Sequence, residues 1–379
     1  MLFDIGDPGA AAYIVASGLV EIISEVGGQP RSLGRLGEHE LFGEMALMGD
    51  NTRTARAVAV TAATLYVIPH DSFARCLSDA DPLLRYLLRL TMLRARASLR
   101  ESGAGGAEFT PDAMASERQE ALQRLLIEQD LREALERQEF DLHYQPIVGL
   151  RDGGVRGYEA LLRWRHPAHG AMSPAVFVPV AEASGQIVPI GHWIIDTAVS
   201  AAARLCRSAA VSGPETVSLN LSIRQFDDPL LFPTIESALE RHGLAPRHLK
   251  LEITESLVMS DFDASHALLQ RCKDHGIGLA VDDFGTGYSS LSYLHRLPVD
   301  TLKLDRSFLS DVLANPASWK IVRAVANLAR DLGVQTVAEG VETAEQADAL
   351  REIGIDCAQG FHYARPAPLA TVLDRTQNA

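Results

Sequence analysis

Val281-Asp282-Asp283-Phe284-Gly285-Thr286-Gly287-Tyr288 places two adjacent carboxylates directly after an apolar run, Ile277-Gly278-Leu279-Ala280. The apolar run predicts a buried strand that ends at the aspartates. Neighbouring carboxylates at such a position are costly unless something positive neutralises them. Gly285 and Gly287 permit a tight turn that leaves the strand end open. This stretch therefore predicts a cation-binding site at the end of a buried strand.

Strand-like and helix-like segments alternate from about residue 139 to the end of the chain. Candidate strands lie near 142–148, 155–162, 216–222, 249–254, 278–283, 300–305, 334–339 and 356–361. Helical patterns, such as 193–206, 263–275 and 317–332, lie between most of them. Eight strands with intervening helices predict an α/β TIM-like barrel, in which functional side chains stand at the carboxyl ends of the strands.

Polar side chains do stand in or just after these apolar runs. They are Glu159, Asn220, Glu252, Asp282, Asp283, Lys303, Asp305, Glu339 and Gln359. A single acid at a strand end usually forms a salt bridge or caps a helix. On one rim, however, five or six carboxylates with one lysine would repel one another by several kcal/mol. Hard divalent cations remove that repulsion, and oxygen ligands without a His or Cys cluster favour Mg²⁺ or Mn²⁺ over zinc.

Length and composition are those of a globular protein. The 379 residues are too many for one ordinary core and predict two domains, or one barrel with an attachment. Hydrophobic residues make up 47% of the chain and charged residues 22%, as in folded proteins. The formal net charge of −14 argues against nucleic acid as a partner, because duplex binding requires a basic face.

The cysteines and apolar segments bear on the compartment. The four cysteines are scattered without a CxxC pair: Cys76, Cys206, Cys272 and Cys357. This spacing favours reduced thiols in a reducing compartment. No basic-then-apolar leader opens the chain. The longest apolar helical segment, 193–206, is interrupted by charges and is too short to span a bilayer, so we expect a cytoplasmic protein without membrane contact.

The amino-terminal part has a different pattern. Residues 1–80 are rich in short β patterns, which predict a small antiparallel β-roll. Residues 81–138 predict connecting helices around the linker 101–106, and residues 139–379 hold the barrel pattern. The arginine-lined leucine stripe after Pro82 favours a connecting or dimerising helix over a membrane-surface helix, because Tyr86 is its only aromatic anchor.

The carboxyl-terminal part resembles the EAL family of cyclic di-GMP phosphodiesterases, named for the triplet Glu159-Ala160-Leu161. The resemblance covers about residues 120–375. Its further motifs are Gln145, Leu162-Arg163, Leu219-Asn220-Leu221-Ser222, Glu252-Ile253-Thr254-Glu255, the loop from Asp282 to Gly287, Leu302-Lys303-Leu304-Asp305, Ala338-Glu339-Gly340 and Gln359-Gly360-Phe361. No catalytic position of the family is missing.

The resemblance implies two Mg²⁺ or Mn²⁺ ions per site and hydrolysis of cyclic di-GMP to linear pGpG. The implied metal ligands are Glu159, Asn220, Glu252, Asp282, Asp283 and Glu339. The implied catalytic residues are Lys303, which positions or polarises the attacking water, Glu339, Asp283 and Gln359, and Glu339 stays open between proton acceptor and metal ligand. Gln145, Arg163 and Asp305 are substrate-binding candidates, and Glu255 would brace the loop after Asp283. A homodimer is expected by analogy, with residues 284–288 near the contact.

Phe42-Gly43-Glu44-Met45-Ala46-Leu47-Met48, followed by Arg53-Thr54-Ala55, resembles the phosphate-binding cassette of cyclic-nucleotide-binding domains. In this reading, the backbone at Gly43 and the side chain of Arg53 neutralise a cyclic phosphate, Glu44 accepts the ribose hydroxyl, and Thr54 adds a hydroxyl contact. His39 stands where a turn glycine is common in that family. The resemblance implies a shortened domain without the family's opening helices and first strand. The alternative is a β-roll that has lost its ligand.

We therefore expect a metal-dependent cyclic di-GMP phosphodiesterase regulated by cAMP or cGMP at the amino-terminal domain. The alternative is a non-catalytic cyclic di-GMP receptor, and release of pGpG distinguishes the two. A transcription factor is disfavoured by the acidic balance and by the lack of a helix-turn-helix pattern after residue 100. The sequence leaves open the sign of regulation, the choice of mononucleotide and the native metal.

Overall fold

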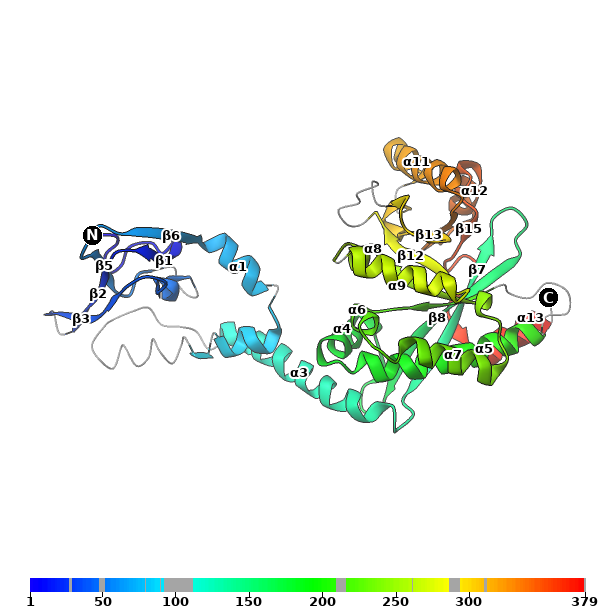
Figure 1. The fold of residues 1–379 in the computed structure, drawn as a ribbon, viewed down its shortest axis with the longest axis horizontal. Helices are drawn as coiled ribbons and strands as arrows, with labels where there is room; N and C mark the ends of the chain where they lie inside the picture. The colour runs from blue at the N-terminus through cyan, green and yellow to red at the C-terminus, as the bar shows by residue number, and fades with distance from the viewer. Residues whose placement is uncertain are drawn as a thin grey trace. The chain divides into compact units, whose positions relative to one another are not determined.

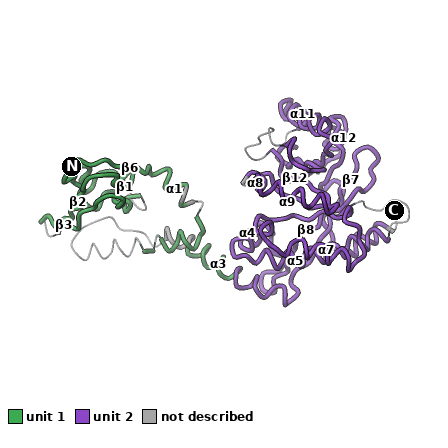
Figure 2. The backbone as a smooth tube through the Cα atoms, in the orientation of Figure 1, with its two compact units in different colours: residues 1–127 green, residues 128–379 purple. Residues whose placement is uncertain are grey.

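The chain folds into two compact units, residues 1–127 and 128–379 (Figure 2). The computed structural model describes residues 1–26, 29–47, 52–78, 80–88, 90–91, 112–208, 216–260, 262–285, 294–309 and 312–377. The expected linker 101–106 and residues 286–288 of the expected dimer contact lie outside these residues.

The first unit contains two small antiparallel sheets, as the short β patterns predict. The strand order is β4-β1-β6 in one sheet and β3-β2-β5 in the other. The bounds are β1 (Ala11–Ser17), β2 (Val20–Val26), β3 (Gln29–Leu36), β4 (Leu41–Phe42), β5 (Arg56–Ala59) and β6 (Thr64–Pro69), with η1 (Glu44–Ala46) after β4 and α1 (His70–Ser78) after β6. Val15, Val20, Phe42 and Ala57 form the buried core of this unit. The expected β-roll is confirmed.

Helix α3 (Asp112–Ala134) contains the division between the units. In the first unit, Arg85 of the helical residues 82–88 pairs with Glu120 of α3 at 2.9 Å. Arg124 of α3 pairs with Asp81 at 2.8 Å. In the second unit, Asp130 of α3 lies 3.0 Å from the imidazole of His166. Polar contacts thus attach each end of α3 to the unit that contains it.

The second unit is a closed barrel of eight strands with helices outside it (Figure 1). The strand order is β7-β8-β10-β11-β12-β13-β14-β15, and β15 pairs with β7 to close the ring. The bounds are β7 (Phe140–Gly149), β8 (Val155–His166), β10 (Thr216–Asn220), β11 (Leu249–Thr254), β12 (Gly278–Phe284), β13 (Thr301–Leu304), β14 (Gln335–Ala338) and β15 (Cys357–Ala358). Short strands β9 (Gly170–Met172) and β16 (Ala367–Pro368) pair with β8 and β7. The expected TIM-like barrel is confirmed.

Strand β7 runs opposite to the other barrel strands, which the sequence pattern does not reveal. It is antiparallel to both β8 and β15, whereas the other neighbours in the ring are parallel. Only residues 150–154 connect β7 to β8, and Gly153 takes a φ of 71° in this turn. A connection this short permits a hairpin but no crossover helix. The hairpin register places Gln145 opposite Glu159.

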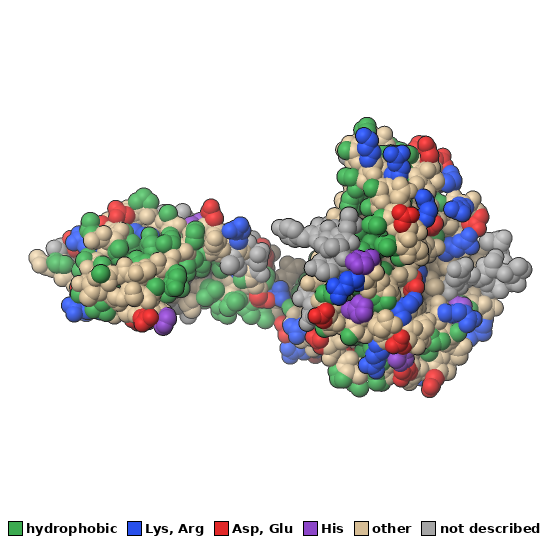
Figure 3. All heavy atoms as spheres, turned by 45° about the horizontal axis from the view of Figure 1, so that its top comes forward, with side chains coloured by type: hydrophobic (Ala, Val, Ile, Leu, Met, Phe, Trp, Pro, Cys, Tyr) green, Lys and Arg blue, Asp and Glu red, His purple; other side chains and the backbone are tan. Residues whose placement is uncertain are grey.

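The helices lie around the outside of the barrel. They are α4 (Pro174–Ser184), α5 (Ile187–Ser208), α6 (Ile223–Phe226), α7 (Leu231–His242), η2 (Pro246–His248), α8 (Glu255–Ser260), α9 (Phe262–Asp274), η3 (Arg306–Phe308), α11 (Pro316–Leu332), α12 (Ala344–Ile353) and α13 (Leu369–Gln377). Among the described residues, none of the helices combines the length and apolar character of a membrane span. On the face of this unit seen in Figure 3, acidic and basic side chains are interspersed.

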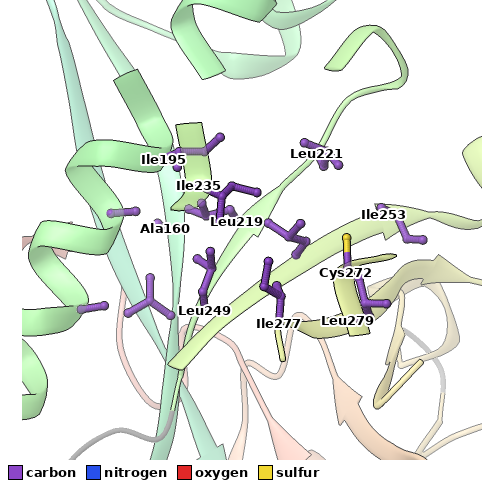
Figure 4. Packing of buried hydrophobic residues seen from close by; sticks show 14 of the residues in the cluster. Ala160, Ile195, Leu219, Leu221, Ile235, Leu249, Ile253, Cys272, Ile277 and Leu279 are labelled. Atoms are coloured by element: carbon purple, nitrogen blue, oxygen red, sulfur yellow. The ribbon is translucent and has the colours of Figure 1, made fainter. Parts of the chain in front are cut away.

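The main core lies between the strands and these helices. In β11, Leu249, Leu251 and Ile253 are at most 1% exposed and belong to one cluster with Ile235 of α7 and Cys272 of α9 (Figure 4). Side chains alternate between the two faces of a strand, so the intervening residues of β11 point into the barrel. Burial of the outer face therefore fixes which polar side chains enter the interior.

Gly360 follows β15 at a point where no side chain fits. A Cβ atom at this position would lie 2.0 Å from the carbonyl oxygen of Val341 and 2.3 Å from its nitrogen. We expect Gly360→Ala to lower the free energy of unfolding by about 2–4 kcal/mol, measured by urea denaturation.

The matched control is Gly154→Ala, because a Cβ there would meet Asp152 Oδ1 at an ordinary 3.5 Å. This variant should change stability by less than about 1 kcal/mol. Equal stability of Gly360→Ala and the wild type would contradict the packing described for this turn.

Candidate functional site

Lys303 of β13 stands at the centre of a group of carboxylates inside the barrel. Its side chain is 1% exposed, and its Nζ lies 2.5 Å from Glu252 Oε2 and 2.6 Å from Glu339 Oε1. Asp282 Oδ1 follows at 3.3 Å and Glu159 Oε2 at 3.5 Å. These acids come from β8, β11, β12 and the residue after β14, so the barrel brings together positions that are far apart in the sequence. We call Glu159, Glu252, Asp282, Asp283 and Glu339 the acid cluster.

Two amide side chains donate to Glu159, and a third, that of Gln145, accepts from one of them. Gln359 Nε2 donates to Glu159 Oε2 at 2.6 Å and to Gln145 Oε1 at 3.0 Å. Asn220 Nδ2 donates to Glu159 Oε1 at 2.7 Å. Gln145 in turn donates to the carbonyl oxygen of Ala364 at 3.1 Å. Both oxygens of Glu159 therefore accept hydrogen bonds, and its carboxylate has one orientation.

One lysine does not neutralise the acid cluster. Burial opposes the charge of Lys303, but Glu159, Glu252 and Glu339 outweigh it and raise the pKa of Lys303 well above its usual value. Burial likewise opposes ionisation of Glu159, yet Lys303 and the amide hydrogen bonds lower the pKa of that carboxyl. For two other acids of the cluster, burial and acidic neighbours outweigh the attraction of Lys303. Burial and neighbouring acids raise the pKa of Glu252 to about 8 and that of Glu339 to about 7, despite Lys303.

The acid cluster fits a divalent metal. One carboxylate oxygen each from Asp282, Asp283 and Glu339 lies within 4.8 Å of the others. Burial and the charge of Asp282 raise the pKa of Asp283. Oxygen-rich groups of this kind suit hard cations such as Mg²⁺ and Mn²⁺. A bound cation would lower the repulsion between the carboxylates, which contributes to the raised pKa values.

The backbone at Asp283 explains how two adjacent aspartates share one site. Neighbouring side chains of a regular strand point to opposite faces. Asp283, however, has a φ of 53°, in the left-handed region that few non-glycine residues adopt. The pairing of β12 with β13 is irregular between Val281 and Phe284, and the left-handed conformation lets Asp282 and Asp283 approach the same point. Such an outlier is typical of functional sites.

The remaining predicted residues lie around this centre. Glu255 Oε2 accepts a hydrogen bond from the backbone nitrogen of Gly285 at 3.0 Å, directly after the aspartates. Asp305 accepts from the backbone nitrogen of Ser307 at 2.9 Å and caps η3. Arg163 is half-buried on β8 and donates to the carbonyl oxygen of Leu162 at 2.8 Å. Burial lowers the pKa of this guanidinium.

Sequence reasoning missed how central Lys303 is. It gave Lys303 a role toward the attacking water, whereas the structure also places four carboxylates within 3.5 Å of Lys303 Nζ. The alternation Thr301-Leu302-Lys303-Leu304 was a usable signal. Because Leu302 and Leu304 are at most 1% exposed, the lysine between them must point to the opposite face.

The first unit contains a second candidate site around Arg53. Arg53 is 4% exposed and donates to the carbonyl oxygens of Gly43 at 2.9 Å and Ala11 at 2.7 Å. Burial lowers the pKa of Arg53, although Asp7 and Glu44 act in the opposite direction. No carboxylate of the described residues forms an ion pair with it. A buried guanidinium without an ion-pair partner is suited to an anionic ligand.

Backbone geometry supports the same site. Gly43 has a φ of 79° and precedes η1, which begins at Glu44. A Cβ atom at Gly43 would lie 2.7 Å from Arg53 Nη1, so only glycine leaves room for the guanidinium. Thr54 is half-buried beside Arg53 in the chain. His39, which replaces the usual turn glycine, does adopt a left-handed φ of 68°.

Comparison with known proteins assigns a family to each of two parts of the chain. Residues 128–366 match the family described as EAL domain, and residues 1–80 match the cyclic nucleotide-binding domain. Structures of the EAL enzyme Bd1971 bound to cAMP, to cGMP, and to cAMP with cyclic-di-GMP are 32–33% identical. They cover 99% of this chain and 97% of their own, with TM-scores of 0.70, 0.71 and 0.72.

Two curated relatives from Pseudomonas aeruginosa are also similar. The bifunctional diguanylate cyclase/cyclic di-GMP phosphodiesterase MucR is 41% identical over 307 residues, 80% of this chain. The cyclic di-GMP phosphodiesterase NbdA is 42% identical over 254 residues, 66% of this chain. The chain spans only 43% and 32% of the lengths of these two proteins. Because the EAL match extends over most of the sequence and includes every residue of the acid cluster, the chain belongs to the EAL domain family.

Proposed function

We propose that this protein is a metal-dependent phosphodiesterase that hydrolyses cyclic di-GMP to linear pGpG. The observation that carries the proposal is the convergence of four carboxylates on the buried Nζ of Lys303. A receptor that only binds the dinucleotide has no need to bury so much uncompensated negative charge. The names of MucR and NbdA support the same activity.

Electrostatics requires metal ions at this site. Cyclic di-GMP carries two negative phosphodiesters, which the acid cluster alone would repel. Two Mg²⁺ or Mn²⁺ ions, held by Glu159, Asn220, Glu252, Asp282, Asp283 and Glu339, would neutralise these groups, activate a water and stabilise the charge that develops at phosphorus. The native choice between the two metals follows from affinity and availability, since both accept oxygen ligands.

The chain's own residues then have separate tasks. Lys303 would fix the positions of the Glu252 and Glu339 carboxylates and present a positive charge to the attacking water. Glu339, which contacts Lys303 Nζ, would either bind a metal ion or accept the proton of the attacking water. Gln359 orients Glu159 directly, and Gln145 supports Gln359. Both amides would also contact the substrate or a water. Arg163 and Asp305 would bind the substrate's phosphate and base, and Glu255 would hold the turn at Gly285.

We further propose that cAMP or cGMP binds the first unit and changes the rate of hydrolysis. Gly43, Glu44, Arg53 and Thr54 would bind the cyclic phosphate and ribose. The Bd1971 structures support this reading, because they contain cAMP or cGMP and are similar to this protein over 99% of its chain. In this scheme residues 1–80 are the sensor, 81–138 the connection and 139–379 the catalytic barrel of a cytoplasmic homodimer. A nucleotide changes the rate only if it binds one arrangement of the connection better than another.

Removal of metal tests the central assignment. Purified protein with Mg²⁺ or Mn²⁺ should release pGpG from cyclic di-GMP, and chelation with EDTA should reduce turnover to background because the acid cluster then repels the substrate. Chromatography of the nucleotides gives the rate, and added Mg²⁺ should restore it. Tight binding of cyclic di-GMP without release of pGpG, with metal present, would instead establish the receptor.

Lys303→Met tests the role of the buried ammonium. We expect turnover to fall at least about 100-fold, and metal-free stability to fall by about 3–5 kcal/mol, because the substitution leaves buried carboxylates without their partner. Mn²⁺ should recover part of the lost stability by neutralising the same groups. Thermal and urea unfolding with and without Mn²⁺ measure this.

Lys273→Met is the matched control, because Lys273 pairs with Asp300 at 2.6 Å but is 34% exposed. It should cost less than about 1 kcal/mol. Wild-type turnover in Lys303→Met would refute the proposed centre.

Arg53→Met tests the nucleotide site. Loss of the buried guanidinium should weaken binding of cAMP and cGMP by at least about 100-fold, because the cyclic phosphate loses its principal charge-assisted hydrogen bonds. Isothermal titration measures the affinity, and circular dichroism checks the fold. Arg56→Met is the control, since Arg56 pairs with Asp4 and is 42% exposed. Wild-type affinity in Arg53→Met would show that the nucleotide does not bind at Arg53.

A further inference from the structure

A cavity of about 40 Å³ lies inside the barrel, on the amino-terminal side of the acid cluster. Thr216, Thr301 and Gln335, the first residues of β10, β13 and β14, line its lower part. Glu252 and Lys303 form its upper boundary. The cavity thus connects the underside of the candidate site with the opposite end of the barrel. The family's reaction takes place at the carboxyl ends of the strands, and none of the roles assigned above uses this cavity.

The sequence explains why the cavity exists. Side chains two residues apart on a strand share a face, so Ser218 lies below Asn220 and Lys250 lies below Glu252. TIM barrels usually fill this region with layers of bulky branched residues. Here Ile147 and Val337 are the branched apolar residues of the lining; the other side chains are small or polar, and Gly157 contributes none. The apolar packing that closes an ordinary barrel is therefore incomplete.

Two residues that line this cavity, Ser218 and Glu252, each have a buried polar atom without a hydrogen-bond partner. Ser218 is fully buried and its Oγ makes no hydrogen bond. Glu252 is 1% exposed and its Oε1 makes none either. Each unsatisfied buried group costs about 1–3 kcal/mol. By contrast, Lys250 Nζ donates to Thr301 Oγ1 at 2.9 Å in the same cavity.

We propose that this cavity is a buried water site whose water joins Ser218 Oγ to Glu252 Oε1. A water needs about 10–15 Å³ of such volume and two to four polar partners, so the cavity has room for about three waters. Water donates to a carboxylate and also accepts from a hydroxyl, which satisfies both atoms. A metal cation is disfavoured at this position, because Arg156, Lys250 and Lys303 line the same cavity.

Ser218 is then a positioning residue for Glu252, a statement that rests on the proposed role of Glu252 as a metal ligand. The bound water fixes Oε1 of this carboxylate while Lys303 holds Oε2. Partners that orient metal ligands typically contribute about 10–100-fold to metal affinity. Ser218 touches neither substrate nor metal in this account.

Two measurements test the proposal: the electron density in the cavity and the affinity of the protein for Mn²⁺. Crystals of the metal-free wild type should show ordered water within hydrogen-bond distance of both Ser218 Oγ and Glu252 Oε1. In Ser218→Ala the affinity for Mn²⁺, measured by calorimetry without substrate, should fall about tenfold, and Ser218→Thr should restore most of it by returning the hydroxyl. Ser265→Ala is the control, because Ser265 is equally buried, at 3% exposure, but lies on the outer helix α9.

A dry cavity in the wild type would overturn the proposal, as would equal Mn²⁺ affinity of Ser218→Ala and Ser265→Ala. The wild-type density decides the water site even if Ser218→Ala does not fold. Failure of the phosphodiesterase assignment is recognised separately, since a wild type that releases no pGpG still yields both the density and the Mn²⁺ affinity.

Discussion

The buried ammonium of Lys303 is the interaction on which the second unit depends. Four carboxylates from separate strands approach it, and in the absence of metal it is the charge that makes their burial tolerable. The compensation is incomplete, because the pKa values of Glu252 and Glu339 remain raised. The same imbalance that destabilises the metal-free protein creates affinity for cations. Stability and metal binding are therefore two consequences of one charge distribution.

The barrel supplies the geometry for this charge distribution. Alternation along each strand buries leucines and isoleucines under the outer helices and turns the intervening polar side chains inward. The left-handed conformation of Asp283 adds one carboxylate that a regular strand would point away. The antiparallel β7 brings Gln145 beside Glu159 and Gln359, which completes the amide network. Local backbone departures thus place the groups that periodicity alone would separate.

Much of this arrangement was predictable from sequence, because apolar runs that end in acids specify both the strands and their functional ends. The direction of β7 was not, since an apolar pattern is the same along either direction. The fourfold contact of Lys303 and the φ of Asp283 depend on tertiary distances that no local pattern contains. In the first unit, the sequence motif assigns Gly43 and Arg53 to one site, and in the structure Arg53 Nη1 donates to the carbonyl oxygen of Gly43 at 2.9 Å. The cavity below Glu252 was not predictable, because it depends on the volumes of side chains from several strands.

The central claim is that the acid cluster holds paired divalent ions. The most direct measurement is anomalous diffraction from crystals grown with Mn²⁺ and a slowly hydrolysed cyclic di-GMP analogue. The account predicts two manganese peaks bounded by Glu159, Glu252, Asp282, Asp283 and Glu339, with phosphate oxygens beside them. Analogue bound at the barrel mouth with no manganese among these carboxylates would contradict it.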